Sequence, residues 1–388
     1  MISSPGILPD SASVVIVGGG VIGVSAAFHM AEAGVHDVVL IERGELGSGS
    51  TSRAAGGVRA QFSDPINIAL AKRSLDAYVD FARRPGADIG LRQVGYLFLL
   101  TTEQDVAMFS RNIRLQNQLG VPSRLLSAEE AHRLCPLVDV SDVVAAAYSP
   151  DDGHATPEAV VDGYARGARD HGAKLITGSS IVSIDVRGGE IVAVRTTHGV
   201  IRTGTVICAA GAWSRAVGDM VGVELDVTPM RRQLIFTGPV EDMPDRLPMT
   251  IDFSTGLYFH QEGPGLLIGM SDPNAPPGFA TAYDDGWVPM IAEAIANRAP
   301  RLLSAGVRSG WAGLYEMTPD HNALIGEAES PSRFLYATGF SGHGFLQAPA
   351  VGEVLRDLYL RRHPLVDVAG LSARRYSEDT ARVELSII

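Results

Sequence analysis

The feature that most constrains the fold is a glycine turn set between two apolar segments near the start of the chain. Residues 14–17 form a short β-branched run, which is typical of a buried strand. The turn at residues 18–23 follows, helical spacing extends over residues 21–33, and residues 37–41 again resemble a strand. This order predicts a β-α-β unit of the kind that binds a dinucleotide.

The turn has the spacing Gly18-x-Gly20-x-x-Gly23. In such a turn the first glycine allows the tight bend, the second lets a pyrophosphate approach the backbone, and the third lets the helix pack closely on the strand. Glu42 ends the second strand, where it can accept a hydrogen bond from a ribose hydroxyl. We also expect its neighbour Arg43, and Val21 inside the turn, to contact the ligand. The motif does not distinguish NAD from FAD.

A second glycine turn lies near the other end of the chain. Residues 337–345, with the sequence ATGFSGHGF, lead into a helical pattern over residues 346–360. The start of a helix presents unpaired backbone N–H groups and a partial positive charge. Two such helix starts predict that one large anionic ligand is held at both of its ends.

The composition narrows the class of protein. With 388 residues, 46% of them hydrophobic, the chain can bury one large core or two domains that share an interface. Its net charge of −12 argues against nucleic acid or an anionic membrane as a partner. Lys72 and Lys174 are the only lysines, so a cation in a functional site is expected to be an arginine.

Other features set further expectations. Cys135 and Cys208 are too few for a disulfide framework or a zinc site, so we predict inert thiols, no metal and a cytoplasmic location. The apolar run at residues 14–27 is interrupted by four glycines, which argues against a membrane span.

The rest of the chain alternates between β-α-β segments and segments rich in strands. Helices are predicted over residues 66–82 and 104–119, and another begins at Thr156-Pro157, with the threonine as its cap. Residues 181–195 predict a β-hairpin around Gly188-Gly189. Further strands are predicted at residues 94–100 and 205–208, and short strands over residues 230–270.

The predicted fold class is α/β, with two domains that meet in a cleft. A Rossmann-like domain is expected from residues 1–84, 150–220 and 319–388. A substrate domain of α+β type with a mixed sheet is expected from residues 85–149 and 221–318.

Several downstream motifs make the prediction more specific. They are GSGSTSRAAGG at residues 47–57, GVRAQF at 57–62, VGYLFLL at 94–100, AAGAWS at 209–214, WAGLY with TPD at 311–320, and the closing turn. Together they resemble the D-amino-acid oxidase superfamily of FAD amine oxidases, over essentially the whole chain. Within it the chain is most similar to the branch of sarcosine oxidase and the dye-linked L-proline dehydrogenase β-subunit.

This resemblance implies FAD as the cofactor. The residues expected to contact it downstream of Arg43 are Ser50, Thr51, Arg53, Ala54, Ala55, Gly56, Gly57, Val182 (at the adenine), Ala210, Gly211, Trp213, Gly313, Gly339, Gly342, His343, Gly344, Phe345 and Leu346. Relatives that attach the flavin covalently use a histidine in the segment that matches Ser52–Ala54, or a cysteine in the segment that matches Ala312–Tyr315. Because Arg53 and Gly313 stand there, we expect non-covalent FAD.

The resemblance also places the closing turn beside the flavin, with the helix start after Gly344 aimed at the C2 carbonyl of the ring. A helix start favours an anion by about 0.3–1 kcal/mol, or up to about 2 when partly buried, and so would favour the reduced flavin. For His343, a direct catalytic role and simple packing in the turn both remain open.

For the substrate, Arg59 matches the arginine that holds the amino-acid carboxylate in sarcosine-oxidising relatives. Tyr258 and Tyr315 are candidates to line the substrate pocket. The expected reaction removes hydride from the carbon next to nitrogen in a small secondary amino acid, such as sarcosine or L-proline, and gives an imine. Where oxygen-using relatives carry lysines, this chain has Leu267 and Leu346, so we expect either slow use of O2 or another electron carrier.

Three alternatives stay open. The first is a glycine-oxidase-like enzyme for primary amines, although Tyr315 stands where that family has an arginine. The second is a nicotinamide-dependent dehydrogenase. The third is a flavin-binding subunit that works only in a hetero-oligomer, and homo-oligomers are equally possible.

Overall fold

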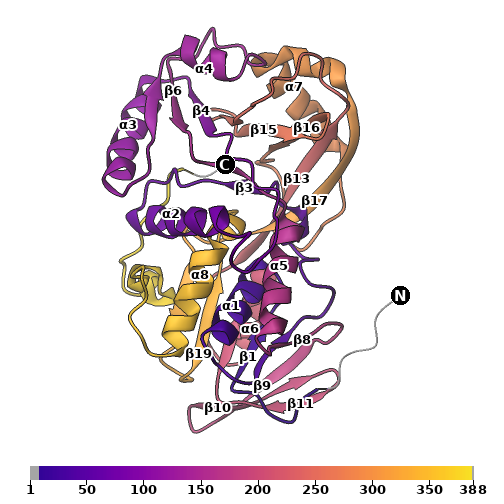
Figure 1. Ribbon diagram of the computed structural model, residues 1–388, viewed down its shortest axis with the longest axis vertical. Helices are drawn as coiled ribbons and strands as arrows, with labels where there is room; N and C mark the ends of the chain where they lie inside the picture. The colour runs from indigo at the N-terminus through magenta and orange to yellow at the C-terminus, as the bar shows by residue number, and fades with distance from the viewer. Residues whose placement is uncertain (1–7, 387–388) are drawn as a thin grey trace.

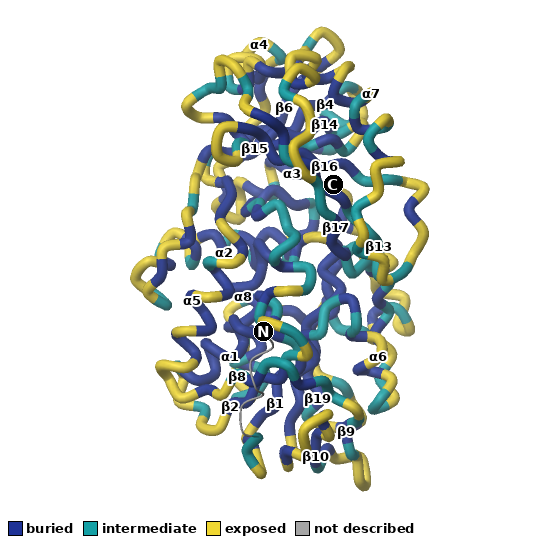
Figure 2. The backbone as a smooth tube through the Cα atoms, turned by 90° about the vertical axis from the view of Figure 1, so that its right-hand side faces the viewer, coloured by how far each residue is buried: buried dark blue, intermediate teal, exposed yellow. Residues whose placement is uncertain are grey.

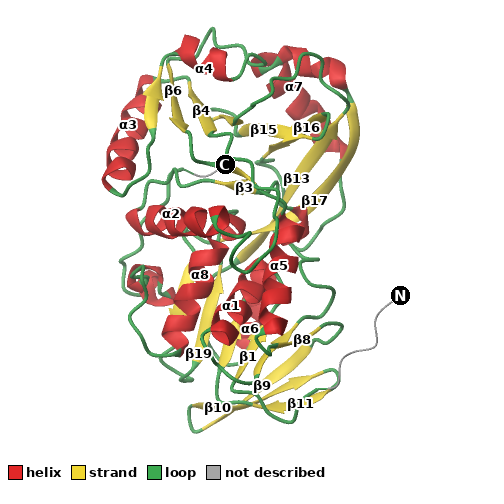
Figure 3. Cartoon of the chain, viewed as in Figure 1, coloured by secondary structure: helices red, strands yellow, loops and turns green. Residues whose placement is uncertain are grey.

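The computed structural model describes residues 8–386 and has two halves stacked along its long axis (Figure 1). One half is built on a six-stranded sheet and the other on an eight-stranded sheet (Figure 3). Buried backbone runs through both halves and across the region between them, while exposed backbone follows the outer loops and helices (Figure 2). The region between the two sheets is therefore interior.

The six-stranded sheet is parallel except for one edge strand. Its order is β18 (Leu324–Glu327), β19 (Phe334–Thr338), β12 (Val206–Cys208), β1 (Val14–Val17), β2 (Val38–Ile41) and β8 (Lys174–Ile176), and only β18 is antiparallel to its neighbour. Three helices pack over one face, in one hydrophobic core with it: α1 (Val21–Glu32), α5 (Pro157–Asp170) and α8 (Gly344–Tyr359). Helix α1 lies between the other two, which explains why it is buried on all sides.

The opposite face of this sheet packs against an antiparallel three-stranded sheet. Its strands are β9 (Ile181–Arg187), β10 (Glu190–Thr196) and β11 (Gly199–Arg202). Short helix α6 (Ser214–Asp219) follows β12. This layering confirms the predicted Rossmann-like α/β half.

The eight-stranded sheet is mixed, because β14 and β4 are parallel and its other pairs are antiparallel. Its order is β17 (Val307–Met317), β13 (Thr228–Thr237), β16 (Gly265–Met270), β15 (Leu257–Glu262), β14 (Met249–Asp252), β4 (Tyr96–Leu100), β6 (Ala145–Ser149) and β5 (Arg124–Leu126). Helices α4 (Ala128–Leu134) and α7 (Val288–Arg298) cover its outer face, and α3 (Glu103–Gln118) lies beside β4 and β6. Helix α2 (Pro65–Val79) packs on α8 between the halves (Figure 1).

Most elements predicted from local pattern are present with small shifts at their ends. The hairpin around Gly188-Gly189 is confirmed. Thr156 is the N-cap residue of α5, as predicted, although its side chain makes no capping hydrogen bond. Helices α4 and α7 were not predicted.

The predicted domain boundaries stay a prediction. The six-stranded sheet takes its strands from residues 14–41, 174–208 and 324–338, and the eight-stranded sheet from residues 96–149 and 228–317. Residues 1–7 and 387–388 of the predicted domains lie outside the described residues. Within residues 8–386, no helix is long and apolar enough to cross a membrane.

Candidate functional site

A cavity of about 570 Å³ lies where the two halves meet. It is lined by the four candidate substrate residues, Arg59, Tyr258, Tyr315 and His343, and by most of the predicted cofactor residues. The latter are Gly18, Gly20, Val21, Glu42, Arg43, Ser50, Thr51, Arg53, Ala54, Ala55, Gly56, Gly57, Ala210, Gly211, Trp213, Gly313, Gly342, His343, Gly344, Phe345 and Leu346. The fold therefore gathers segments from the whole chain around one cavity.

Three predicted cofactor residues do not line this cavity. Gly23 packs the helix start against the turn, because a Cβ there would lie 1.9 Å from the Gly18 carbonyl oxygen. Gly339 has φ +68°, and a Cβ there would lie 2.5 Å from a methyl carbon of Thr318. Val182 is 59% exposed, and Ile181 lines the cavity instead. The Val182 side chain therefore points away from the cavity, and the contact with the adenine that we expect from its backbone groups stays a prediction.

The N-terminal turn leaves its backbone open toward the cavity. Helix α1 begins after Gly20, which has no side chain to cap the helix. The N–H of Val21 donates to the Thr51 hydroxyl oxygen at 3.2 Å, so that hydroxyl keeps its own proton to donate. At Gly18 a Cβ would lie 2.3 Å from the Ala209 carbonyl oxygen. This arrangement fits a diphosphate bound at a helix start.

Beyond this turn, Glu42 and Arg43 contribute in different ways. The Glu42 carboxylate accepts hydrogen bonds from the N–H of Gly19 at 2.6 Å and of Gly44 at 2.7 Å. It therefore braces the turn, and a bond to a ribose stays a prediction. The Arg43 guanidinium lies 3.7 Å from the centre of the Trp213 ring, which stacks on Phe279.

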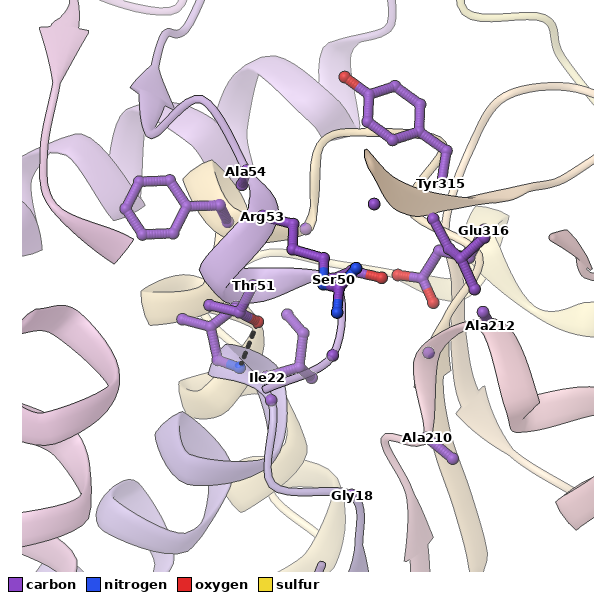
Figure 4. A pocket seen from close by; sticks show the side chains of 18 of the residues that line it. Gly18, Ile22, Ser50, Thr51, Arg53, Ala54, Ala210, Ala212, Tyr315 and Glu316 are labelled. Atoms are coloured by element: carbon purple, nitrogen blue, oxygen red, sulfur yellow. Dashed lines mark hydrogen bonds between the residues drawn. The ribbon is translucent and has the colours of Figure 1, made fainter. Parts of the chain in front are cut away.

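The loop after the short 3₁₀ helix at Thr51–Arg53 ties the two halves together. Arg53 donates to the Ala312 carbonyl oxygen on β17 at 2.7 Å, and its side chain extends into the cavity (Figure 4). A Cβ on Gly313 would lie 2.9 Å from the Arg53 Cβ. A Cβ on Gly57 would lie 1.9 Å from the Tyr96 hydroxyl oxygen. Glycine is therefore needed at both positions, because the loop packs closely against strands of the eight-stranded sheet.

The closing turn is positioned by contact with β17. Helix α8 begins after His343 with no side-chain cap. Gly342 has φ +97°, and a Cβ there would lie 2.4 Å from the Tyr315 ring. The first residues of α8 line the cavity, so the helix start lies beside the ligand site.

Arg59 is 2% exposed and is held by backbone carbonyls. It donates to the carbonyl oxygens of Gln61 and Ser386, and its Nη2 lies 3.4 Å from His343 Nε2. The guanidinium also lies 4.2 Å from the centre of the Phe62 ring. These contacts involve only part of its five N–H donors, so it can still bind a carboxylate.

Residues 384–386 form a strap over the loop that follows Arg59. The Glu384 carboxylate is 1% exposed and accepts from the N–H and hydroxyl of Ser63, the N–H of Asp64 and the amide of Asn67, at 2.6–3.0 Å. The N–H of Ser386 donates to the same carboxylate at 2.9 Å. Glu384 therefore fixes both the loop and the Ser386 carbonyl that contacts Arg59.

The other candidate substrate residues are uncharged near neutral pH. Burial, together with the nearby Arg59 charge, holds the pKa of His343 well below its usual value, so its ring is neutral. This neutral ring can accept from Arg59, which favours packing and hydrogen bonding over proton transfer. Burial also raises the pKa of Tyr258 and of Tyr315, so both keep their hydroxyl protons.

Reasoning from the sequence missed several residues in or near the cavity. Glu316 lines it between Gly211 and Thr338, and burial raises the pKa of its carboxyl to about 7. Asp152, behind Arg59, accepts from the N–H of Ala60 at 3.1 Å, and burial raises its pKa to about 7. Arg232 and Tyr96 also line the cavity. Tyr96 lies in the VGYLFLL motif but was not singled out from it, and Glu316, Asp152 and Arg232 lie outside the motifs. An arginine inside a strand pattern was a usable signal for Arg232.

Comparison with known proteins identifies the family. A family model described as FAD dependent oxidoreductase matches residues 13–358. The chain belongs to this family. Its cofactor is FAD, and the open helix starts and the small residues along the Arg53 loop fit that group.

Individual relatives agree with this assignment. Mitochondrial dimethylglycine dehydrogenase of Mus musculus is 31% identical over 97% of this chain, which spans 46% of that enzyme. Glycine oxidase of Geobacillus kaustophilus is 30% identical, with 94% of this chain and 97% of that protein covered. The crystal structure of L-proline dehydrogenase from P. horikoshii superposes with a TM-score of 0.91 at 34% identity, covering 97% and 100% of the two chains. The chain thus spans about half the length of the first curated relatives.

Proposed function

We propose that this protein oxidises the C–N bond of a small secondary amino acid, such as sarcosine or L-proline, to an imine. The observation that carries this proposal is Arg59, a buried guanidinium with free donors in the same cavity as the flavin-binding turns. A bidentate arginine–carboxylate contact would orient the substrate. The relatives named above support the reaction class.

When bound, FAD supplies the acceptor for the hydride that leaves the substrate carbon. The residues of this chain orient the substrate and exclude water. Arg59 would bind the carboxylate, and Tyr258 and Tyr315 would border the amine with neutral hydroxyls. The pKa of His343 is held well below its usual value and its Nε2 faces Arg59, so its ring would be a weak base and would help to position Arg59. An apolar wall lowers the pKa of an ammonium group, which favours the neutral amine that the reaction needs.

We also propose that FAD is held without a covalent bond and that O2 or another carrier accepts its electrons. No lysine lines the cavity among residues 8–386, and Leu346 does. Arg59 and Arg232 nevertheless place positive charge at the cavity, which could take over the role of the missing lysines toward O2. Both cysteines are buried and free, which supports a reducing compartment such as the cytoplasm.

The test is anaerobic mixing with sarcosine, L-proline, N-methylalanine and glycine, while the flavin absorbance is followed. Bleaching by secondary amines before glycine would support the proposal, and bleaching by glycine alone would favour a glycine oxidase. Admission of O2 with peroxide detection then identifies the acceptor. A coloured protein that none of them bleaches would point to a subunit that needs a partner, and a colourless one would contradict the flavin assignment. Acid precipitation that left the yellow colour on the protein would show a covalent flavin.

A further inference from the structure

A second arginine faces the cavity from the eight-stranded sheet. Arg232 lies on β13 with its partner residue Gly313 on β17, and Gly313 contacts Arg53 at the cavity wall. Leu234, two residues further along the strand, also lines the cavity. Because strand residues two apart share a face, Arg232 and Leu234 point the same way, into the cavity.

This guanidinium has no acidic partner among the residues that the structure describes. Its Nη1 donates to the carbonyl oxygen of Arg231 at 3.1 Å, and its Nε is buried without any hydrogen-bond acceptor. The adjacent Arg231 is different, since it pairs with the Asp284 carboxylate at 3.1 Å. Among the described residues, the fold therefore supplies a carboxylate partner for Arg231 and none for Arg232.

Arg232 lies beside Tyr315, a residue of the proposed substrate pocket. Its guanidinium carbon is 5.3 Å from the centre of the Tyr315 ring, and that ring packs on Gly342 of the closing turn. The charges of both Arg232 and Arg59 act on the Tyr315 hydroxyl. Tyr315 is therefore near both cations in the substrate half of the cavity.

An arginine that is partly buried without an anion is unfavourable, because the charge has lost water and gained no counter-ion. A ligand carboxylate would supply the missing acceptor with the two-pronged geometry that guanidinium prefers. If Arg59 binds the α-carboxylate, Arg232 is available for a second carboxylate on the same ligand, because both arginines line the cavity near Tyr315.

We infer that Arg232 forms a second anion-binding subsite, and that the substrate is an amino acid that carries a second carboxylate. This inference rests on the proposed function and specifies its substrate class. Hydride transfer would be unchanged: the C–H bond of the carbon next to nitrogen would break, the hydrogen would leave with its electron pair as hydride to FAD, and the neutral amine would become a protonated imine. The second carboxylate only adds binding contacts.

The test compares two non-oxidisable ligands of the FAD-loaded protein, diglycolate and methoxyacetate. Each has an ether oxygen in place of the amine and one carboxylate, and only diglycolate has the second carboxylate. Titration is followed by the change in the flavin spectrum. We expect the natural chain to bind diglycolate about tenfold or more tightly than methoxyacetate, as for a charge-assisted hydrogen bond. In Arg232→Met the two affinities should become nearly equal, through loss of diglycolate binding alone.

Two further variants are matched controls. Arg231→Met removes the arginine that already has a partner, and should preserve the preference for diglycolate. Arg232→Lys keeps a positive charge and should retain part of that preference, provided that its flavin spectrum is unchanged. Equal binding of both ligands by the natural chain, or equal effects of Arg231→Met and Arg232→Met, would overturn the inference.

Oxidation of matched substrates separates the inference from the proposed function. Iminodiacetate should bleach the flavin with a kcat/KM about tenfold or more above that of sarcosine, and Arg232→Met should remove this difference. If both are oxidised and Arg232→Met slows them equally, the subsite is wrong and the function stands. If no amino acid is oxidised but diglycolate is still preferred, the function is wrong and the subsite stands.

Discussion

The two sides of the cavity offer different groups for binding anions. On the side of the six-stranded sheet, backbone N–H groups at the starts of α1 and α8 face the ligand, and glycines bring the backbone close. On the side of the eight-stranded sheet, side chains face the ligand. Arg232, Tyr258 and Tyr315 come from its strands, and Arg59 comes from a nearby loop.

Because of this difference, we expect the cofactor half and the substrate half to tolerate amino-acid substitutions to different degrees. A backbone site depends on the absence of side chains, so adding one methyl group can destroy it. A side-chain site depends on individual charges and on what positions them, so substitutions there change affinity by degrees. The predictions below test this contrast, from the largest expected effect to the smallest.

Gly23→Ala should abolish FAD binding. Its Cβ would lie 1.9 Å from the Gly18 carbonyl oxygen, so the start of α1 would have to move away from the turn. The measurement is the flavin absorbance per mole of purified protein. Gly204→Ala is the control, because no atom lies within 4 Å of a Cβ placed there. If Gly23→Ala retained a full complement of FAD, the prediction that the cofactor half does not tolerate an added methyl group would be wrong.

Arg59→Met should keep FAD and lower kcat/KM for amino-acid substrates about 10- to 100-fold, which corresponds to the loss of a charged hydrogen bond worth about 1.5–3 kcal/mol. The rate of anaerobic flavin bleaching against substrate concentration measures it. The exposed Arg111→Met controls for net charge. A variant that lost FAD as well would mean that Arg59 serves the cofactor and not the substrate.

Glu384→Gln should weaken the binding of methoxyacetate several-fold and destabilise the fold by about 1–3 kcal/mol, since backbone N–H donors would lose a charged acceptor. Ligand titration of the flavin spectrum and urea unfolding measure the two effects. Glu378→Gln, at an exposed position, is the control. Reduced stability with unchanged ligand affinity would show that the strap supports the loop without positioning Arg59.

Glu316→Gln should change how stability depends on pH. Burial raises the pKa of Glu316 from its ordinary value of 4.5 to about 7, so the native state binds more protons than the unfolded state between these values. Stability therefore falls as the pH rises through this window, by at most about 1.4 kcal/mol per pH unit for one group. Urea unfolding between pH 5 and pH 7 should show a shallower decline in the variant. Some decline in stability should remain in the variant, because burial also raises the pKa of Asp152.

The contrast also explains what could be predicted from the sequence. The N-terminal turn, the closing turn and the hairpin around Gly188-Gly189 are local backbone patterns, and each was predicted at its place. The motifs that resemble FAD amine oxidases led to Arg59, Tyr258, Tyr315 and His343, which the fold brings to one cavity. The sequence did not show which side of β9 faces inward, so it did not predict that Ile181 lines the cavity.

The sequence by itself determined the two glycine turns and the helices that follow them, because glycine spacing and apolar periodicity act over a few residues. Only the tertiary structure decided that the Glu384 strap holds the loop of Arg59, that Arg231 finds Asp284 while Arg232 finds no acid within residues 8–386, and that Glu316 is buried at the cavity. Each of these depends on residues that are distant in the chain. Whether a charged side chain has a partner of opposite charge depends on which distant residues the fold places beside it.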